Sequence, residues 1–195
     1  MAVDKLFEGG RDSAVGTLAE AFSTDPLWSW MLELAPSDAM PRVMSLLVDG
    51  GLVNESIWET GSCDALQIWV PQGRPELTPD QEHRLTQLIE SFGSETAHRM
   101  LPTFGVFEEA RHTNPPHNYL SMFATRAALK GQGVGGTVMR AALEQLDREG
   151  ISAYLESSNP ANVPLYEHFG FEVIGYLPLA QGTPPVRNMW RPAPS

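Results

Sequence analysis

The feature that most constrains the fold of this chain is a glycine-rich segment, Lys130-Gly131-Gln132-Gly133-Val134-Gly135-Gly136. It follows an apolar run typical of a strand and precedes an amphipathic run typical of a helix. Glycine allows positive φ angles and a close approach of the backbone to a ligand, and a helix N-terminus presents unpaired N–H groups to an anion. The segment therefore predicts a loop that holds a phosphate-bearing ligand, in preference to a merely flexible turn.

The last third of the chain has a regular pattern around this loop. We expect a strand at 119–125, a helix at 134–149 that stops at Gly150, and a second strand at 151–157. Strand, helix and strand within about 40 residues indicate a parallel pair with a right-handed crossover. A short helix at 163–169, a strand at 171–177 and a segment at 186–190 that pairs back complete this part.

The first 116 residues are less regular. We expect a weak strand at 2–7, helices at about 12–22 and 37–49, and a hairpin of strands at 56–60 and 65–70. A helix follows Thr78-Pro79, a second one at about 95–112 is interrupted at Pro102 and Gly105, and 113–116 is a linker. No internal repeat is visible, and we expect one domain over 1–195 with an α/β fold.

Three kinds of phosphate-binding loop could use these glycines. A Walker A loop has Lys before its Ser or Thr, whereas here Thr137 directly follows Gly136. The dinucleotide fingerprint matches literally at Gly131, Gly133 and Gly136, with Glu156 about 20 residues on. However, 126–130 separate the strand from the first glycine, and 59 residues after Gly136 are too few for the rest of a doubly wound sheet. The third alternative is a loop that binds coenzyme A (CoA).

Several segments in the last 80 or so residues resemble the core of the GNAT superfamily of acetyltransferases. They are the strand 119–125, the loop 130–135, the strand end 154–158, Asn159-Pro-Ala-Asn162 and Leu165-Tyr-Glu-His-Phe-Gly-Phe171. Within the superfamily, the sequence is most similar to the puromycin N-acetyltransferase-like group. The similarity lies in Leu155-Glu-Ser-Ser158, the Asn-x-Pro-x-Tyr-Glu step at 162–167, a Met before the final basic residues, and the opening at 21–26. Arg126 and Leu129 depart from the superfamily pattern, and the first 115 residues match it only loosely.

This resemblance implies a mixed α/β sheet of the GNAT type, with central parallel strands that splay apart. Residues 1–116 would form the acceptor-side half, and 117–195 the acetyl-CoA-binding core with a C-terminal hairpin. The implied activity is N-acetyl transfer from acetyl-CoA to an amine within a ternary complex. The residues expected to bind acetyl-CoA lie on the strand, the loop and a short helix: Phe123, Ala124, Thr125, Lys130, Gly131, Gln132, Gly133, Val134, Gly135, Gly136 and Asn162.

Three side chains are candidates for proton transfer. The resemblance gives Tyr166 the role of general acid toward the leaving thiolate, which suits a phenol with a pKa of about 10. An aliphatic ammonium also has a pKa near 10, so a base must remove a proton from it at neutral pH. Glu156, which the resemblance also places in that role, is the first candidate, acting directly or through water. His117 is the alternative base because imidazole titrates near neutrality.

The acceptor is expected to be a small cationic amine of the antibiotic or aminonucleoside kind, which would make the chain an antibiotic-resistance enzyme. The net charge of -11 favours encounter with cations. Asp25, Trp28 and Trp30 lie in the segment that this fold sends over the acceptor site, and they suit an amine on an apolar scaffold. The alternatives are N-acetylation of a peptide or protein α-amino group, and a non-catalytic module that binds CoA or a nucleotide.

Composition excludes several other classes. The acidic balance argues against nucleic-acid partners, and no apolar run approaches the roughly 20 residues that cross a membrane. A single cysteine, Cys63, and the absence of a secretion signal predict a cytoplasmic protein. No cluster has the spacing of metal ligands, so no metal is expected. The oligomeric state stays open, with a homodimer as one option.

Overall fold

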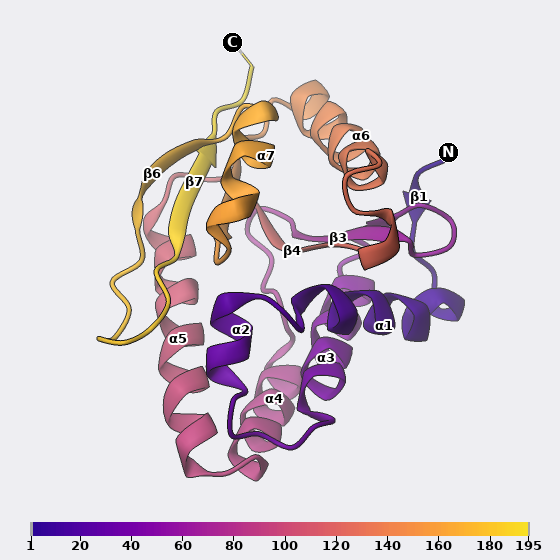
Figure 1. The fold of residues 1–195 in the computed structure, drawn as a ribbon. Helices are drawn as coiled ribbons and strands as arrows, with labels where there is room; N and C mark the ends of the chain where they lie inside the picture. The colour runs from indigo at the N-terminus through magenta and orange to yellow at the C-terminus, as the bar shows by residue number, and fades with distance from the viewer. Residues whose placement is uncertain (1, 195) are drawn as a thin grey trace.

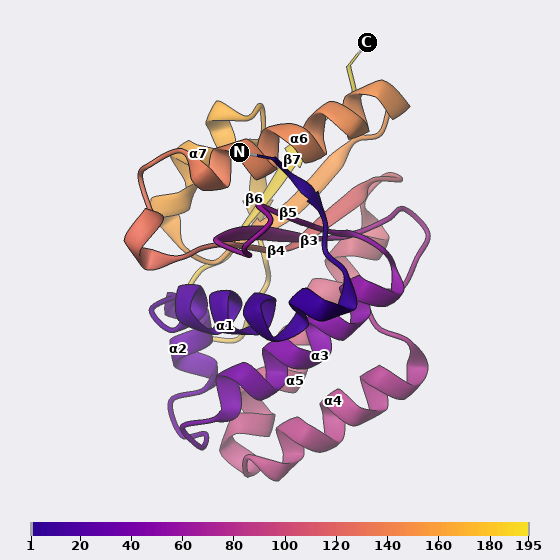
Figure 2. The ribbon, with the colours of Figure 1, turned by 90° about the vertical axis from the view of Figure 1, so that its right-hand side faces the viewer.

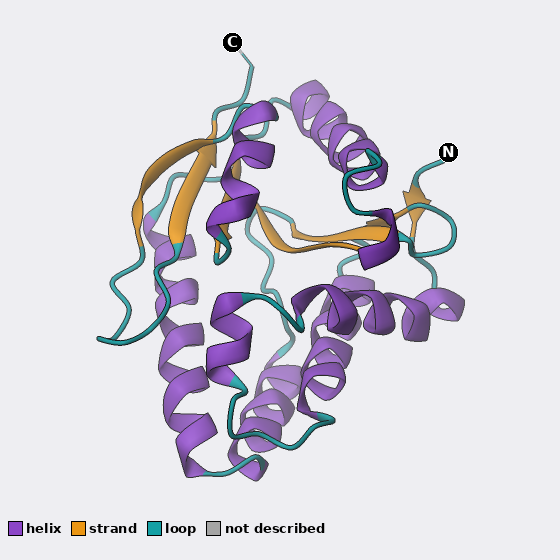
Figure 3. Cartoon of the chain, viewed as in Figure 1, coloured by secondary structure: helices purple, strands orange, loops and turns teal. Residues whose placement is uncertain are grey.

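The computed structural model describes residues 2–194; residues 1 and 195 of the predicted domain lie outside this range. Figure 1 shows a sheet of strands with helices on both of its faces, and Figure 3 separates the two kinds of element by colour. The strand order is β1-β2-β3-β4-β5-β7-β6. The strands are β1 (Asp4–Lys5), β2 (Ile57–Glu59), β3 (Ala65–Val70), β4 (Asn118–Thr125), β5 (Ala153–Ser157), β6 (Glu172–Tyr176) and β7 (Arg187–Arg191). The expected mixed α/β sheet is confirmed.

The central parallel pair is short. β4 and β5 are in register at Asn118↔Ala153, Tyr119↔Tyr154 and Leu120↔Leu155, although β4 continues to Thr125 and β5 to Ser157. Beyond Leu120 and Leu155 the two strands separate, as the resemblance predicted. The separation opens the sheet at the carboxyl ends of both strands.

Helix α6 (Val134–Glu149) connects β4 to β5 across the upper face in Figure 1. Its buried side chains, Val138, Ala142 and Leu146 among them, recur every four residues and pack above β3 and β4. The helix ends at Gly150, whose φ of 66° is the left-handed conformation that glycine adopts without strain. The predicted helix at 134–149 is confirmed.

The helices of the first 113 residues lie below the sheet in Figures 1 and 2. They are α1 (Arg11–Phe22), α2 (Pro26–Met31), α3 (Ala39–Val53), α4 (Pro79–Ser91) and α5 (Ser94–Thr113). The larger core cluster, which includes Leu18, Met31, Met44, Ile68 and Ile89, fills the space between these helices and the sheet. Short 3-10 turns occur at η1 (Glu8–Gly10), η2 (Ala127–Leu129) and η3 (Pro160–Asn162), and α7 (Val163–His168) precedes β6.

The predicted interruption of the helix near residue 100 is wrong. α5 runs unbroken through Pro102 and Gly105. Pro102 removes one backbone donor, and the hydroxyl of Thr103 donates to the carbonyl of Arg99 at 2.7 Å in the same turn. Burial of Met100 and Thr103 on the core side of the helix favours the helical conformation through tertiary packing, which local propensity does not register.

Candidate active site

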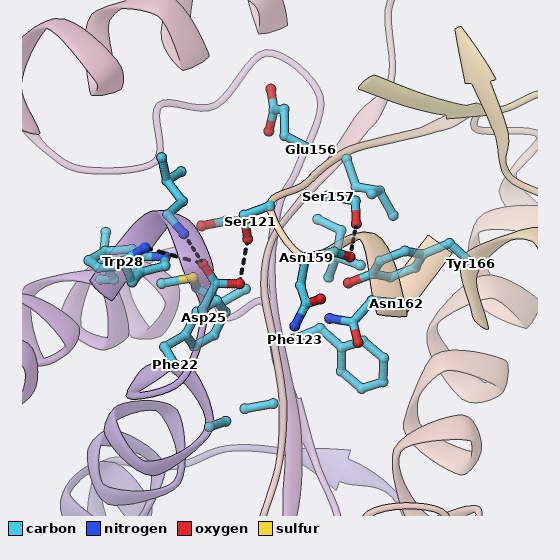
Figure 4. A pocket seen from close by; sticks show the side chains of 18 of the residues that line it. Phe22, Asp25, Trp28, Ser121, Phe123, Glu156, Ser157, Asn159, Asn162 and Tyr166 are labelled. Carbon is cyan, nitrogen blue, oxygen red and sulfur yellow. Dashed lines mark hydrogen bonds between the residues drawn. The ribbon is translucent and has the colours of Figure 1, made fainter. Parts of the chain in front are cut away.

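A cavity of about 890 Å³ lies where β4 and β5 separate. Its wall combines the glycine loop and the start of α6 with β4, the end of β5 and α7, and it extends downward among α1, α2, α4 and α5. Figure 4 shows side chains from both halves of the chain converging on it. One continuous space therefore joins the predicted cofactor side to the predicted acceptor side.

The glycine loop leaves open space at the start of α6. Gly131 and Gly133 have φ angles of +77° and +81°, and a Cβ added to either would meet no atom within 4 Å. Both line the cavity, as do Lys130 and Val134. Free N–H groups at the first turn of a 16-residue helix, with a Lys beside them, fit the pyrophosphate of a CoA molecule.

Gly135 has a different reason to be glycine. A Cβ there would lie 2.5 Å from the Thr125 hydroxyl oxygen and 3.0 Å from the Phe123 ring, so this residue sets the close packing of α6 on β4. Gln132 donates to the carbonyl of Ala128 at 2.9 Å and is not part of the cavity wall. Its contact stabilises the loop from within.

The remaining predicted acetyl-CoA contacts line the cavity. Phe123, Ala124 and Thr125 form its β4 wall, and Gly136 lies in the first turn of α6. Asn162 lines the opposite side, next to the start of α7. A slender arm that enters between the separated strands would meet the β4 backbone on one side and Asn162 on the other.

Tyr166 projects from α7 into this side of the cavity, near Asn162 in Figure 4. The residue is buried, and its ring packs against Phe123 and Phe171 with centroids 6.3 and 6.1 Å away. Burial and, to a smaller extent, the nearby charge of Asp25 raise the pKa of the phenol. Tyr166 therefore stays protonated at neutral pH and can donate a proton.

Glu156, near the end of β5, is the second titratable group of the site. Both carboxylate oxygens are buried without a hydrogen-bond partner, and they point away from Tyr166 in Figure 4. Burial raises the pKa of Glu156 from 4.5 to about 7, although Tyr119, Tyr154 and Arg111 partly offset this rise. A carboxylate with a pKa near 7 is half ionised at neutral pH and can take up a proton there.

His117 lies elsewhere. It precedes β4, its ring packs edge-on against Tyr154 and Trp190 with centroids at 5.1 and 5.5 Å, and its Nδ1 lies 2.6 Å from the Pro115 carbonyl oxygen. Burial lowers its pKa, and the cavity wall does not include it. The geometry supports Glu156, and not His117, as the base that faces the cavity.

The predicted acceptor residues differ in position. Trp28 lines the cavity, but Trp30 lies outside its wall, where the Arg99 guanidinium stacks on the Trp30 ring at 5.1 Å. Asp25 lines the cavity and is buried, yet its carboxylate already accepts three hydrogen bonds. They come from the amides of Leu27 and Trp28 at 3.0 and 3.2 Å and from the Ser158 hydroxyl at 2.7 Å. Asp25 thus begins α2 and connects it to the end of β5, an N-cap that the Asp-Pro pair in the sequence could have indicated.

Sequence reasoning missed a charged group near Glu156. Glu76 and Arg111 form an ion pair of 3.2 Å on the cavity wall, and the Ser121 hydroxyl donates to Glu76. Arg111 also lies over the Tyr119 ring at 4.9 Å. No local pattern in the sequence connects Glu76, in the loop after β3, with Arg111 or Ser121, which lie 35 and 45 positions further along the chain.

Two further properties concern residues 2–194, the part of the chain that the structure describes. Within that range, no group of three or more His, Cys, Asp or Glu side chains could hold a metal ion. Over the same range, none of the helices combines the length and apolar character needed to cross a membrane.

Comparison with known proteins finds similarity to acetyltransferases. The sequence model of the Acetyltransferase (GNAT) family matches residues 103–171. An uncharacterized N-acetyltransferase of Schizosaccharomyces pombe is 22% identical over 183 residues, which is 88% of this chain and 74% of that protein. Arylalkylamine N-acetyltransferase 2 of Aedes aegypti superposes with a TM-score of 0.70 at 10% identity, covering 99% of both chains. A Corynebacterium glutamicum structure described as histone acetyltransferase HPA2 and related acetyltransferase superposes at 0.67 with 20% identity, over 100% of this chain and 97% of that one. The similarity to the puromycin N-acetyltransferase-like group stays a prediction.

Proposed function

We propose that this chain is an N-acetyltransferase of the GNAT family, whose sequence model matches residues 103–171, and that it acetylates the amine of a small cationic molecule by direct transfer from acetyl-CoA. The observation that carries the proposal is the continuous cavity that the glycine loop, Tyr166 and Glu156 all line. A module that only bound CoA or a nucleotide would have no use for a buried carboxylate with a pKa near 7 on the acceptor side.

The acyl donor would occupy the space between the separated strands. The loop and the first turn of α6 would hold its pyrophosphate, and Asn162 would bond to its pantetheine arm. The β4 backbone near Phe123 to Thr125 has no strand partner on the β5 side beyond Leu120, so the N–H groups that point to that side are available to polarise the acetyl carbonyl.

The chain's own residues then account for the proton transfers. Glu156, ionised, takes one proton from the acceptor ammonium directly or through water, and the free amine attacks the thioester carbonyl. The new C–N bond forms, the C–S bond breaks, and Tyr166 gives its proton to the departing sulfur. The second proton of the attacking nitrogen then returns to the Tyr166 phenolate, directly or through water, which leaves a neutral amide. The raised pKa of Tyr166 keeps this proton in place until the thiolate develops.

Charge supports a cationic acceptor. Glu76, Glu82, Glu108 and Glu156 line the cavity, and Arg111 is the cationic side chain that pairs with one of them. We retain the antibiotic or aminonucleoside class as the acceptor and resistance as the corresponding role. We also retain the cytoplasm as the location, because Cys63 is a buried free thiol and acetyl-CoA is an intracellular metabolite.

The test is a thiol-release assay with acetyl-CoA and a panel of amines: puromycin, aminoglycosides, polyamines and short peptides. We expect kcat/KM to be highest for one of the small amines, with Tyr166→Phe as the inactive control. Turnover of peptides alone would replace the acceptor class with a peptide α-amino group. Binding of CoA without thiol release from any amine would favour the non-catalytic alternative.

A further inference from the structure

The part of the cavity below the sheet has a different chemistry from the part near the glycine loop. We call it the apolar compartment and define it by the apolar side chains that α1 to α5 and the loop before α4 contribute to the wall: Phe22, Leu27, Trp28, Leu47, Leu77, Leu85, Ile89, Leu101, Phe104 and Phe107. Glu156 and Arg111 lie at its sheet end. Figures 1 and 2 show these helices grouped on one side of the sheet, opposite α6.

Helix α5 shows that the compartment is a space left open in the core. Leu101, Gly105 and Glu108 recur at spacings of four and three residues, so they share one face of the helix, and all line the cavity. Leu101 and Phe104 are only half-buried although they pack against the main core cluster. These two side chains are therefore not fully covered by protein atoms, and an apolar ligand in the cavity would complete their packing.

The charged groups of the compartment lie at its ends. At the sheet end, Arg111 neutralises Glu76 within an ion pair, which leaves Glu156 as the carboxylate without a hydrogen-bond partner. Glu82 and Glu108 are exposed and therefore lie at the rim. A molecule with several ammonium groups would have to place some of them against Leu and Phe side chains, where burial of an unpaired charge is unfavourable.

We propose that the acceptor carries its reactive amine at one end of an apolar body, an aryl or extended alkyl group, which lies in the apolar compartment while the nitrogen reaches Glu156. The inference rests on the proposed function and narrows it: amines with an apolar body fit, whereas polyamines and aminoglycosides do not. The acetylated product loses its charge, so its nitrogen no longer interacts with Glu156.

The experiment measures kcat/KM for a series of n-alkylamines from ethylamine to octylamine and for phenylalkylamines, with spermidine and an aminoglycoside beside them. Each added methylene should raise kcat/KM about three- to fourfold until the compartment is filled, as expected for burial of one methylene group. Spermidine and the aminoglycoside should react at least 100-fold less efficiently than the best member of the series.

Gly105 allows a variant that narrows the compartment. A Cβ at Gly105 would meet no protein atom within 4 Å, and Gly16, on the exposed face of α1, is a matched helical glycine with the same property away from the cavity. Gly105→Phe should lower kcat/KM for the longest amines tenfold or more, while the values for ethylamine and the KM for acetyl-CoA stay within twofold. Gly16→Phe should change none of them.

Calorimetry in the presence of CoA separates the two proposals. Tight binding of long amines without thiol release would contradict the proposed function and leave the compartment as a binding site. A flat alkylamine series, or preference for spermidine that Gly105→Phe does not alter, would overturn the inference while acetyl transfer stood.

Discussion

Replacing Glu156 with Gln should remove a pH-dependent loss of stability. The same substitution should also lower the activity. Burial raises the pKa of Glu156 from 4.5 to about 7, and each pKa unit corresponds to about 1.4 kcal/mol. Because the folded state holds the proton more tightly than the unfolded state, the free energy of unfolding falls as pH rises from 4.5 to 7. The loss is absent below pH 4.5 and reaches about 3 kcal/mol above pH 7.

Urea unfolding followed by tryptophan fluorescence, at pH 4 and pH 8, measures this difference. Between these pH values, the wild-type chain should lose about 3 kcal/mol more stability than Glu156→Gln. Glu109→Gln, at an exposed position on α5, is the matched control and should follow the wild type. Parallel pH dependences of wild type and Glu156→Gln would refute the buried-carboxylate reasoning.

The activity of the same proteins should change in the opposite sense. Wild-type kcat/KM should fall about tenfold per pH unit below pH 7, as the carboxylate becomes protonated. Glu156→Gln should be about 10²- to 10⁴-fold less active, without that acid limb. An unchanged acid limb in the variant would assign it to another group.

Three further predictions concern the rest of the site. Tyr166→Phe should lower kcat about 10²-fold while calorimetry finds CoA affinity within threefold of wild type, since only the proton for the leaving group is lost; unchanged turnover with chemistry rate-limiting would remove Tyr166 from the mechanism. Gly133→Val should weaken CoA binding about tenfold, because a β-branched residue is strained at a φ of +81°. Gly135→Val should chiefly lower the melting temperature, because its side chain meets Thr125, and equal effects of the two variants on CoA affinity would contradict this distinction. Asp25→Ala should cost about 1 kcal/mol of stability through loss of the α2 cap, whereas Asp25→Asn should keep the cap and leave the KM for the acceptor within threefold of wild type. A large rise in that KM for Asp25→Asn would mean that the Asp25 carboxylate binds the acceptor.

Local patterns predicted the part of the site in which neighbouring residues act together. The glycine loop, the start of α6 and the short helix with Tyr166 each depend on residues within a few positions of one another, and all three line the same cavity. Because side chains alternate along a strand, Leu155 and Glu156 lie on opposite faces of β5: Leu155 packs in the cluster under α6, whereas Glu156 faces Tyr119 and Arg111.

The features of the site that the sequence did not predict correctly depend on three-dimensional geometry, which composition and local patterns do not encode. Trp28 and Trp30 were predicted together, but residues two apart on a helix point in nearly opposite directions, so one faces the cavity and the other faces Arg99. The ion pair between Glu76 and Arg111 joins a loop to the end of α5, and only the packed fold brings them together. His117 has a chemically suitable side chain, but an aromatic cluster surrounds it.

The early end of the β4–β5 ladder has a consequence for the shape of ligand that the protein selects. Beyond Leu120, β4 presents backbone donors and acceptors as an interior sheet edge, flanked by α7 and by the Asp25–Ser158 contact. An exposed edge of this kind can recruit a strand of another chain, which is the origin of edge-to-edge aggregation. Here α7 and the Asp25–Ser158 contact flank the edge, so under the proposed function the slender, peptide-like arm of the cofactor would extend the sheet by β-augmentation.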